Sequence, residues 1–243
     1  MMRTDLADIW VYLSASPLLG LTVTLVAYLA AWHLYQRAGA SPLLNPVAVA
    51  VGLLIAFLLI TDIPYGSYFE GAQFVHFLLG PATVALAVPL YRQLSKLRTL
   101  WLPVGAAVLA GVCTAAVSAA VIARLLGATP VTALSLAPKS VTAPVAMGIS
   151  ERIGGLPSLT AVLVVMTGIL GAVLGGKVFD LLRIRDDGIR GVAMGVTSHG
   201  IGTARAFQIS SEMGAFSGLA MALSALASSL ILPWLMRLVA HFI

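Results

Sequence analysis

Charged side chains are scarce in this sequence of 243 residues. Only 9% of the residues are Asp, Glu, Lys or Arg, whereas 60% are hydrophobic and the mean hydropathy is +1.01. A soluble globular protein carries about 25% charged residues, so this chain has too few to cover a soluble core of its size. A lipid bilayer is therefore the expected solvent, and a cytosolic or secreted enzyme is excluded.

Cysteine is almost absent as well, since Cys113 is the single thiol. One cysteine excludes an internal disulfide and a zinc site made of thiolates, and the four histidines lie on separate segments without a metal-binding spacing. Ser198 and His199 are adjacent and so do not face each other on a helix as nucleophile and base. We expect no cofactor and no enzymatic activity. The basic residues are spread out, which is typical of topology signals rather than a nucleic-acid surface.

Long apolar runs are what the sequence has in abundance. A crossing helix needs about 18 to 20 apolar residues, and about eight segments reach this length. They lie near 16–35, 43–61, 68–91, 101–126, 130–150, 157–182, 188–211 and 215–239. The first is expected to stay as a helix, because no small-residue cleavage site follows it. We expect an all-α, polytopic membrane bundle of seven or eight segments that forms a single integral domain over residues 1–243.

The distribution of basic residues predicts which segments cross. If all eight cross, Lys and Arg are divided almost evenly, whereas cytoplasmic loops are normally rich in them. The segment 130–150 holds prolines on both sides of Lys139, so it is the best candidate for a re-entrant loop. If it does not cross, the two sides of the membrane carry unequal numbers of basic residues. One side holds Arg37, Arg92, Lys96, Arg98, Arg183, Arg185, Arg190 and Arg237, and the other holds Arg3, Arg124 and Arg152. This predicts the N-terminus outside, the C-terminus inside, and Glu212 outside.

Three segments are interrupted by residues that break helices. The breaks are Gly80-Pro81, Pro138 within APKSVTAP, and Gly200 with Gly202 within TSHGIGTARA. Proline removes a backbone donor and glycine loosens a helix, so the freed backbone groups need polar partners. A weak repeat accompanies two of the breaks: TAPVAMGISE at 142–151 and TARAFQISSE at 203–212. Discontinuous helices that meet near the midplane, often in inverted repeats, are a recurring device of transporters.

Two basic side chains lie inside apolar segments. A charge such as that of Lys139 or Arg205 costs about 2.5–3.5 kcal/mol at the centre of a spanning helix. One interpretation is structural: they snorkel or pair with Glu151 and Glu212. The functional interpretation is that they bind an anion, Arg205 through a bidentate contact with a carboxylate and Lys139 as a point charge. His199 either binds substrate, carries a proton or donates to a backbone carbonyl.

The candidate substrate-binding residues are the polar side chains at the breaks: Lys139, Arg205, His199, Ser198, Thr203, Ser140, Thr142 and Thr83. The residues expected to break the helices there are Gly80, Pro81, Pro138, Gly200 and Gly202. Asp and Glu stand only at segment ends, so the sequence does not identify which ion, if any, is coupled to transport. In 157–182, a small-residue face that favours helix packing is formed by Gly168, Gly171, Gly175 and Gly176.

Three long stretches resemble a known family. They are LLNPVAVAVGLLIAFLLITDIPYGSYFEGAQFVHFLLGPATVALAVPLYRQL (43–94), LAPKSVTAPVAMGISERIGGLPSLTAVLVVMTGILGAVLG (136–175) and SHGIGTARAFQISSEMGAFSGLAMAL (198–223). They are similar to the LrgB/CidB family, over about residues 40–235, which leaves the first segment outside the resemblance. The resemblance implies a bacterial inner-membrane protein that works with a smaller LrgA/CidA-type membrane subunit in a homo- or hetero-oligomer. It also implies an architecture of the cation/proton antiporter and anion transporter type.

Two functional hypotheses follow, because members resembling this chain are described both as regulators and as carriers. The first is a secondary carrier of a small monocarboxylate of the glycolate, glycerate, pyruvate or lactate class. The second is an antiholin-like or holin-like regulator of murein hydrolase activity and cell lysis that transports no solute. The polar interruptions favour the carrier. A pore-forming oligomer needs amphipathic helix faces and does not need a lysine at a helix break, as Lys139 is beside Pro138.

Overall fold

The computed structural model describes residues 17–41, 44–78, 81, 84–85 and 87–239 of the chain. These ranges contain α-helices and no β-strand, so the predicted all-α class is confirmed. Within them, 4 helices are long and apolar enough to cross a membrane: Leu18–Arg37, Arg98–Leu125, Pro157–Leu181 and Ser211–Val239. The chain divides into two compact units, Met1–Ala85 and Leu86–Ile243, and each is described by itself.

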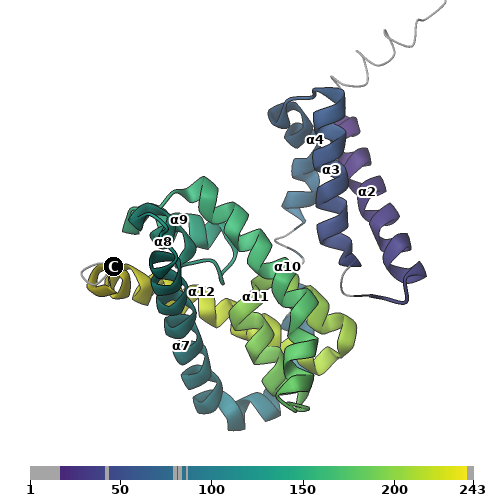
Figure 1. Cartoon of the computed structure of the whole chain (residues 1–243). Coiled ribbons are helices and arrows are strands. Elements are labelled where there is room, and N and C mark those ends of the chain that lie inside the picture. Colours follow the sequence, from purple (N-terminus) through teal and green to yellow (C-terminus); the bar gives the residue numbers. More distant parts are fainter. Residues whose placement is uncertain (1–16, 42–43, 79–80, 82–83, 86, 240–243) are drawn as a thin grey trace, which may run out of the picture. The chain divides into compact units, whose positions relative to one another are not determined.

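The described part of the first unit contains α2 (Pro17–Arg37), α3 (Pro46–Thr61) and α4 (Tyr65–Phe77) (Figure 1). α2 packs against both of the others and corresponds to the helix predicted near 16–35. Gly20 allows this packing, because a Cβ there would collide with the carbonyl oxygen of Tyr68 on α4. The hydroxyls of Thr24 and Tyr68 lie 2.8 Å apart and add a polar contact between α2 and α4.

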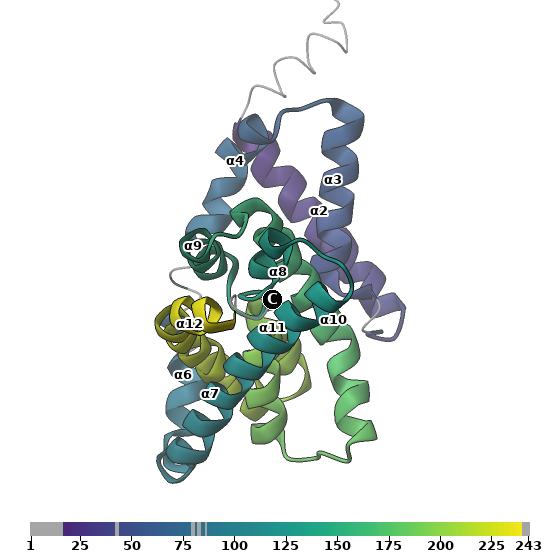
Figure 2. The ribbon, with the colours of Figure 1, turned by 60° about the vertical axis from the view of Figure 1, so that its left-hand side comes forward.

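The second unit carries most of the predicted interruptions. Its helices are α6 (Ala87–Arg92), α7 (Leu94–Leu125), α8 (Pro130–Leu136), α9 (Ala143–Ile153), α10 (Pro157–Leu181), α11 (Asp187–Ile209) and α12 (Ser211–Val239). Figures 1 and 2 show α8 and α9 at the end of α7 that is far from α6. One apolar cluster contains Val112, Val141, Val164 and Val196, and so joins α7, α10 and α11 to the loop between α8 and α9.

The break predicted in the proline-rich segment is present. α8 and α9 are separated by residues 137–142, which are not helical. The end of α8 lies beside the end of α9, because the Thr160 hydroxyl is 2.9 Å from the carbonyl oxygen of Ser135 and 2.7 Å from the hydroxyl of Ser150. The chain therefore enters the unit and returns to the end from which it came. We call residues 130–153 the first hairpin.

α11 is broken at His199, whose backbone angles of φ 40° and ψ −132° are not helical. The chain reverses there, since a Cβ at Gly202 would lie 3.1 Å from the carbonyl oxygen of Met194. In a continuous helix these residues are separated by about 12 Å along the axis. The two ends of α11 also meet, because the Ser210 hydroxyl donates to the Asp187 carboxylate at 2.6 Å. We call residues 187–209 the second hairpin, with His199 at its tip.

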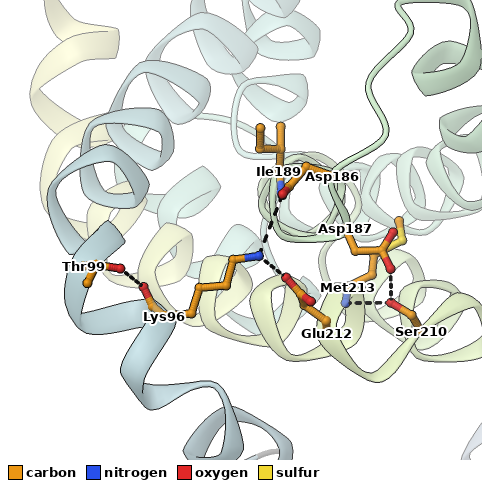
Figure 3. Close-up of polar contacts among 8 residues, drawn as sticks. All are labelled: Lys96, Thr99, Asp186, Asp187, Ile189, Ser210, Glu212 and Met213. Atoms are coloured by element: carbon orange, nitrogen blue, oxygen red, sulfur yellow. Dashed lines mark hydrogen bonds and ion pairs between the residues drawn. The ribbon is translucent and has the colours of Figure 1, made fainter.

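This reversal corrects the predicted topology. The segment 188–211 was predicted to cross the membrane as one helix, which placed Lys96 and Glu212 on opposite sides. In the structure the Lys96 ammonium donates to the Glu212 carboxylate and lies 3.8 Å from that of Asp186 (Figure 3). A helix that folds at its middle returns to the face where it began. α12 then carries Arg237 away from Lys96 over 29 residues, whereas the two were predicted to share a side.

The third predicted break is only partly described. Gly80 and Thr83 lie outside the described residues, whereas Pro81 is helical. α4 ends at Phe77 and α6 begins at Ala87, so the predicted segment 68–91 is not one continuous helix. The single domain over residues 1–243 and the inverted repeat stay predictions.

Candidate functional site

The tip of the second hairpin lies at the middle of α10. The His199 Nε2 atom is 3.0 Å from the carbonyl oxygen of Val164. A Cβ at Gly168 would lie 2.7 Å from Cε1 of the same ring. α10 spans 25 residues, Pro157–Leu181, or about 37 Å, and Val164 and Gly168 are in its central turns. The reversal of the chain therefore occurs near the centre of a membrane-spanning helix.

The polar groups of this tip are buried and joined to one another. Ser198, His199 and Thr203 are 0%, 5% and 3% exposed. The Thr203 hydroxyl donates to the carbonyl oxygen of His199 at 2.8 Å and lies 2.9 Å from the hydroxyl of Ser217 on α12. His199 contacts a backbone carbonyl, which is one of the three roles considered for it. The positive φ at His199 is unusual for a residue with a side chain and marks a backbone conformation that its neighbours must hold in place.

Glycines on α10 make room for the first arm of this hairpin. Gly168 faces His199, Gly171 faces Ser198, and a Cβ at Gly175 would lie 2.6 Å from Sδ of Met194. This confirms that the predicted small-residue face serves helix packing at these three positions. Gly176 has nothing within 4 Å of a Cβ, so it does not belong to the face.

The first hairpin places Lys139 beside Ala115 of α7, ten residues before that helix ends at Leu125. The Lys139 ammonium lies 3.5 Å from the carbonyl oxygen of Ala115 and 3.4 Å from the hydroxyl of Ser140. Pro138 is fully buried and Ser140 is 8% exposed. Thr142 is the N-cap residue of α9, but its side chain makes no capping hydrogen bond. The lysine is therefore held at its root by a buried proline, and its charge is directed toward backbone and hydroxyl oxygens.

The two breaks approach the same stretch of α7. A Cβ at Gly111 of α7 would lie 2.7 Å from Cγ1 of Val196, which is on the first arm of the second hairpin. Ala115, which accepts from Lys139, is one helical turn further along α7. Two half-helices also begin at the breaks, α9 at Ala143 and the returning arm of α11 after His199. Their N-termini carry unpaired backbone N–H groups and partial positive charge.

Arg205 has a different position from the one predicted. It lies on the returning arm, one turn before α11 ends at Ile209, rather than at the tip. It is half-buried, and its guanidinium donates to the side-chain oxygen of Gln208 at 3.0 Å. Glu212, the partner considered for it in the structural interpretation, pairs with Lys96 instead. The structure therefore brings Lys139, rather than Arg205, to the level of the breaks.

A cavity of about 480 Å³ lies between α7 and α11. It follows the first arm of the second hairpin from Asp186 to Thr197, two residues before the tip, and its walls are almost entirely apolar. Phe216 of α12 lines it, and Lys96 lies over the ring of Phe216, 5.7 Å from the centroid. Lys96 and its carboxylate partners therefore stand at one end of a cavity that reaches the level of the breaks.

The hydrogen bond to Glu212 raises the pKa of Lys96 above its ordinary value of 10.5 and outweighs the opposite effect of burial, with help from the charge of Asp186. Lys96 precedes the membrane-spanning part of α7. Because the pKa is raised, the contact stabilises the fold below pH 10.5 and is lost only as the pH rises through the higher value. At neutral pH these contacts hold the first turns of α7, α11 and α12 together.

Sequence reasoning missed the residues that secure the hairpins. Ser135, Ser150 and Thr160 join both arms of the first hairpin to α10, and Ser217 fastens the second. Single hydroxyls in apolar helices carry little pattern, so only their spacing along a buried face offered a signal. No group of three His, Cys, Asp or Glu side chains that could hold a metal ion occurs in the described part of the chain.

The fold and the broken helices define an all-helical membrane protein with two hairpins that turn back inside it. Comparison with known proteins gives the family: the chain belongs to the LrgB-like family, whose match covers residues 24–238. The match includes most of α2, which the resemblance was expected to leave out.

Several relatives align over almost their whole length. The chain is 40% identical over 222 residues to the uncharacterized protein YwbG of Bacillus subtilis, covering 90% of this chain and 97% of the relative. It is 33% identical over 221 residues to the holin-like protein CidB of Staphylococcus aureus, covering 91% and 96%. The holin-like protein CidB of Staphylococcus epidermidis is 31% identical over 227 residues, covering 93% and 98%. No solved structure matches the chain.

Proposed function

We propose that this chain is a secondary membrane carrier of small monocarboxylates of the glycolate, glycerate, pyruvate or lactate class. The observation that carries the proposal is the approach of two broken hairpins to the centre of the unit, with Lys139 at one break. A full charge inside a membrane domain is costly, and such residues mark ion or substrate pathways. Lys139 has oxygen neighbours but no carboxylate partner among the described residues, so an organic anion supplies the missing charge.

The backbone at the breaks supports the same chemistry. α9 and the returning arm of α11 both start near the level of Lys139, and helix N-termini bind anions through their N–H groups. Discontinuous helices with their N-termini directed at a substrate carboxylate are known in transporters. The cavity between α7 and α11 would connect this site to the Lys96 end of the unit.

The order of the hairpins along the chain supports the proposed inverted repeat. The first hairpin lies between the end of α7 and the start of α10, and the second lies between the end of α10 and the start of α12. They therefore enter the unit from opposite ends. The sequence repeat pairs α9 (142–151) with the returning arm of the second hairpin (203–212), which supports a common origin of the two.

We further propose that the carrier is located in the bacterial inner membrane and works with a small LrgA/CidA-type membrane subunit in an oligomer. The Lys96 end carries Lys96, Arg98, Arg183, Arg185 and Arg190, whereas the other end carries Arg124, Arg152 and Arg237. By the positive-inside rule, the Lys96 end faces the cytoplasm. The C-terminus of α12 then faces outward.

Uptake of radiolabelled glycolate, pyruvate and lactate into proteoliposomes tests the proposal. Vesicles with the purified chain, with and without a co-purified small partner, should accumulate at least one of these acids above empty vesicles. The absence of uptake under both conditions would contradict the proposal. Vesicles containing Lys139→Ala serve as the matched negative control.

The second candidate function is regulation of cell lysis, and the names of the relatives favour it, since CidB proteins are called holin-like. A holin-like oligomer would make a membrane permeable to solutes irrespective of their charge. Release of a neutral dye from vesicles that contain the chain would support this function. Dye retention together with carboxylate uptake would support the carrier.

A further inference from the structure

Ser224 on α12 has a hydroxyl that makes no hydrogen bond within the described part of the chain, although the residue is only 1% exposed. Hydroxyls elsewhere on the apolar helices donate to the carbonyl oxygen four residues earlier, as those of Thr24, Thr61, Thr167, Thr197 and Ser229 do. A buried polar group without a partner is costly, and native proteins contain few of them. The hydroxyl of Ser224 therefore needs an explanation beyond packing.

The position of Ser224 connects it with both hairpins. Met221 contacts the second hairpin, with its Sδ atom 3.9 Å from the Thr203 hydroxyl and 4.0 Å from a Cβ built at Gly200. Ser224 comes three residues later, about 4.5 Å further along the axis of α12 and beyond the tip. α12 continues in the direction from which the first hairpin enters, and it packs against α9. Ser224 therefore lies on the part of α12 between its contacts with the two hairpins.

The buried face of α12 is polar along this path. Ser217, Ser224 and Ser228 share one helical face and are at most 1% exposed. The Ser217 hydroxyl is hydrogen-bonded to the Thr203 hydroxyl, whereas the Ser224 hydroxyl has no hydrogen-bond partner among the described residues. A neutral hydroxyl can donate to an anion without bringing a second charge into an apolar interior.

We propose that Ser224 is a substrate-binding residue whose hydroxyl donates to the carboxylate bound between the two hairpins. This inference rests on the proposed carrier function and adds α12 to the site. Lys139 contributes the charge, the half-helix N-termini contribute backbone N–H groups, and Ser224 contributes a donor from the third side. The bound acid thus supplies the partner that the protein itself does not.

The test compares Ser224→Ala with Ser229→Ala in the full chain, using radiolabelled glycolate uptake into proteoliposomes. Ser229 is the matched control, because it lies on the same helix and its hydroxyl donates to the carbonyl oxygen of Ala225 at 2.8 Å. The loss of one hydrogen bond to a charged group should raise the KM of Ser224→Ala about tenfold or more, and Ser229→Ala should stay within about twofold of the parent. Ser224→Cys, a weak donor of similar size, should lie between parent and alanine.

A second measurement separates binding from folding. Without substrate, Ser224→Ala should melt at the same temperature as the parent or higher, because it removes an unsatisfied buried group. An unchanged KM in Ser224→Ala, with an active parent, would overturn the role of Ser224 and leave the carrier function intact. The role of Ser224 would also be overturned if Ser224→Ala melted at a lower temperature than the parent and Ser229→Ala lost uptake to a similar extent. A parent that takes up no glycolate, pyruvate or lactate would overturn the carrier function and this site with it.

Discussion

Lys139 is the residue on which the proposed chemistry depends most. We expect Lys139→Ala to lower carboxylate uptake about 10- to 150-fold, because a hydrogen bond to a charged group contributes about 1.5–3 kcal/mol. Lys139→Arg should retain part of the activity, since the charge remains but the buried site beside Pro138 must fit a larger planar group. The measurement is initial uptake at several glycolate concentrations, with protein abundance matched.

Arg98 and Arg205 are the controls for Lys139. Arg98→Ala should leave uptake almost unchanged, because Arg98 is exposed at the start of the membrane-spanning part of α7. Arg205→Ala should have a smaller effect than Lys139→Ala, given its place near the end of α11. The opposite ranking, with an inactive Arg205→Ala and an active Lys139→Ala, would move the anion site to the returning arm.

Gly168 is the residue that fixes the tip of the second hairpin against α10. In Gly168→Ala the added Cβ would press on the ring of His199, and overpacking of this kind costs about 1–3 kcal/mol. We expect a clearly lower melting temperature in detergent. Gly176→Ala is the control, because nothing lies within 4 Å of a Cβ there and alanine favours helix. Equal melting temperatures for the two variants would show that His199 does not pack against Gly168.

The two hairpins are the elements that distinguish this unit from a simple bundle of crossing helices. A pair of cysteines tests the second hairpin directly: Asp187→Cys with Ser210→Cys, in a Cys113→Ala background. The Asp187 carboxylate and the Ser210 hydroxyl are 2.6 Å apart, so cysteines at these positions should be joined by mild oxidation or by a short bifunctional thiol reagent. In a crossing α11 the same positions would be about 34 Å apart.

The control pair for this experiment is Asp187→Cys with Ser158→Cys, because Ser158 lies in the first turn of α10, at the other end of that helix. This pair should not form an intramolecular disulfide. Failure of the first pair to cross-link, in a protein that still transports, would show that α11 spans the membrane.

The sequence predicted the elements better than their directions. Proline and glycine revealed the breaks at Pro138 and His199, because these residues act on the local backbone. The direction in which a chain leaves a break depends on tertiary contacts, such as those of His199 with Val164 and of Ser210 with Asp187. No local pattern encodes these contacts, so α11 was predicted to cross. The depth of Arg205 likewise depends on where the hairpin turns.

The whole second unit should present its two ends to opposite sides of the membrane. Single cysteines at positions 185 and 211 should react with a membrane-impermeant reagent from the cytoplasmic face, and those at 152 and 237 from the outer face. The prediction rests on the Lys96–Glu212 contact and on the surplus of basic residues at that end. Labelling of 185 and 211 from different faces would contradict the reversal at His199.

The reversal of α11 also has a consequence for biosynthesis. α11 contains 23 residues, yet it is not among the described helices that are apolar enough to cross a membrane. Its buried serine, histidine and threonine find their partners on α10 and α12, and α12 is synthesised after α11. We therefore expect that the insertion machinery does not release α11 into lipid by itself. The second hairpin should assemble late, when α12 has emerged from the ribosome and can close over it, so a chain truncated before Ser211 would lack this half of the site.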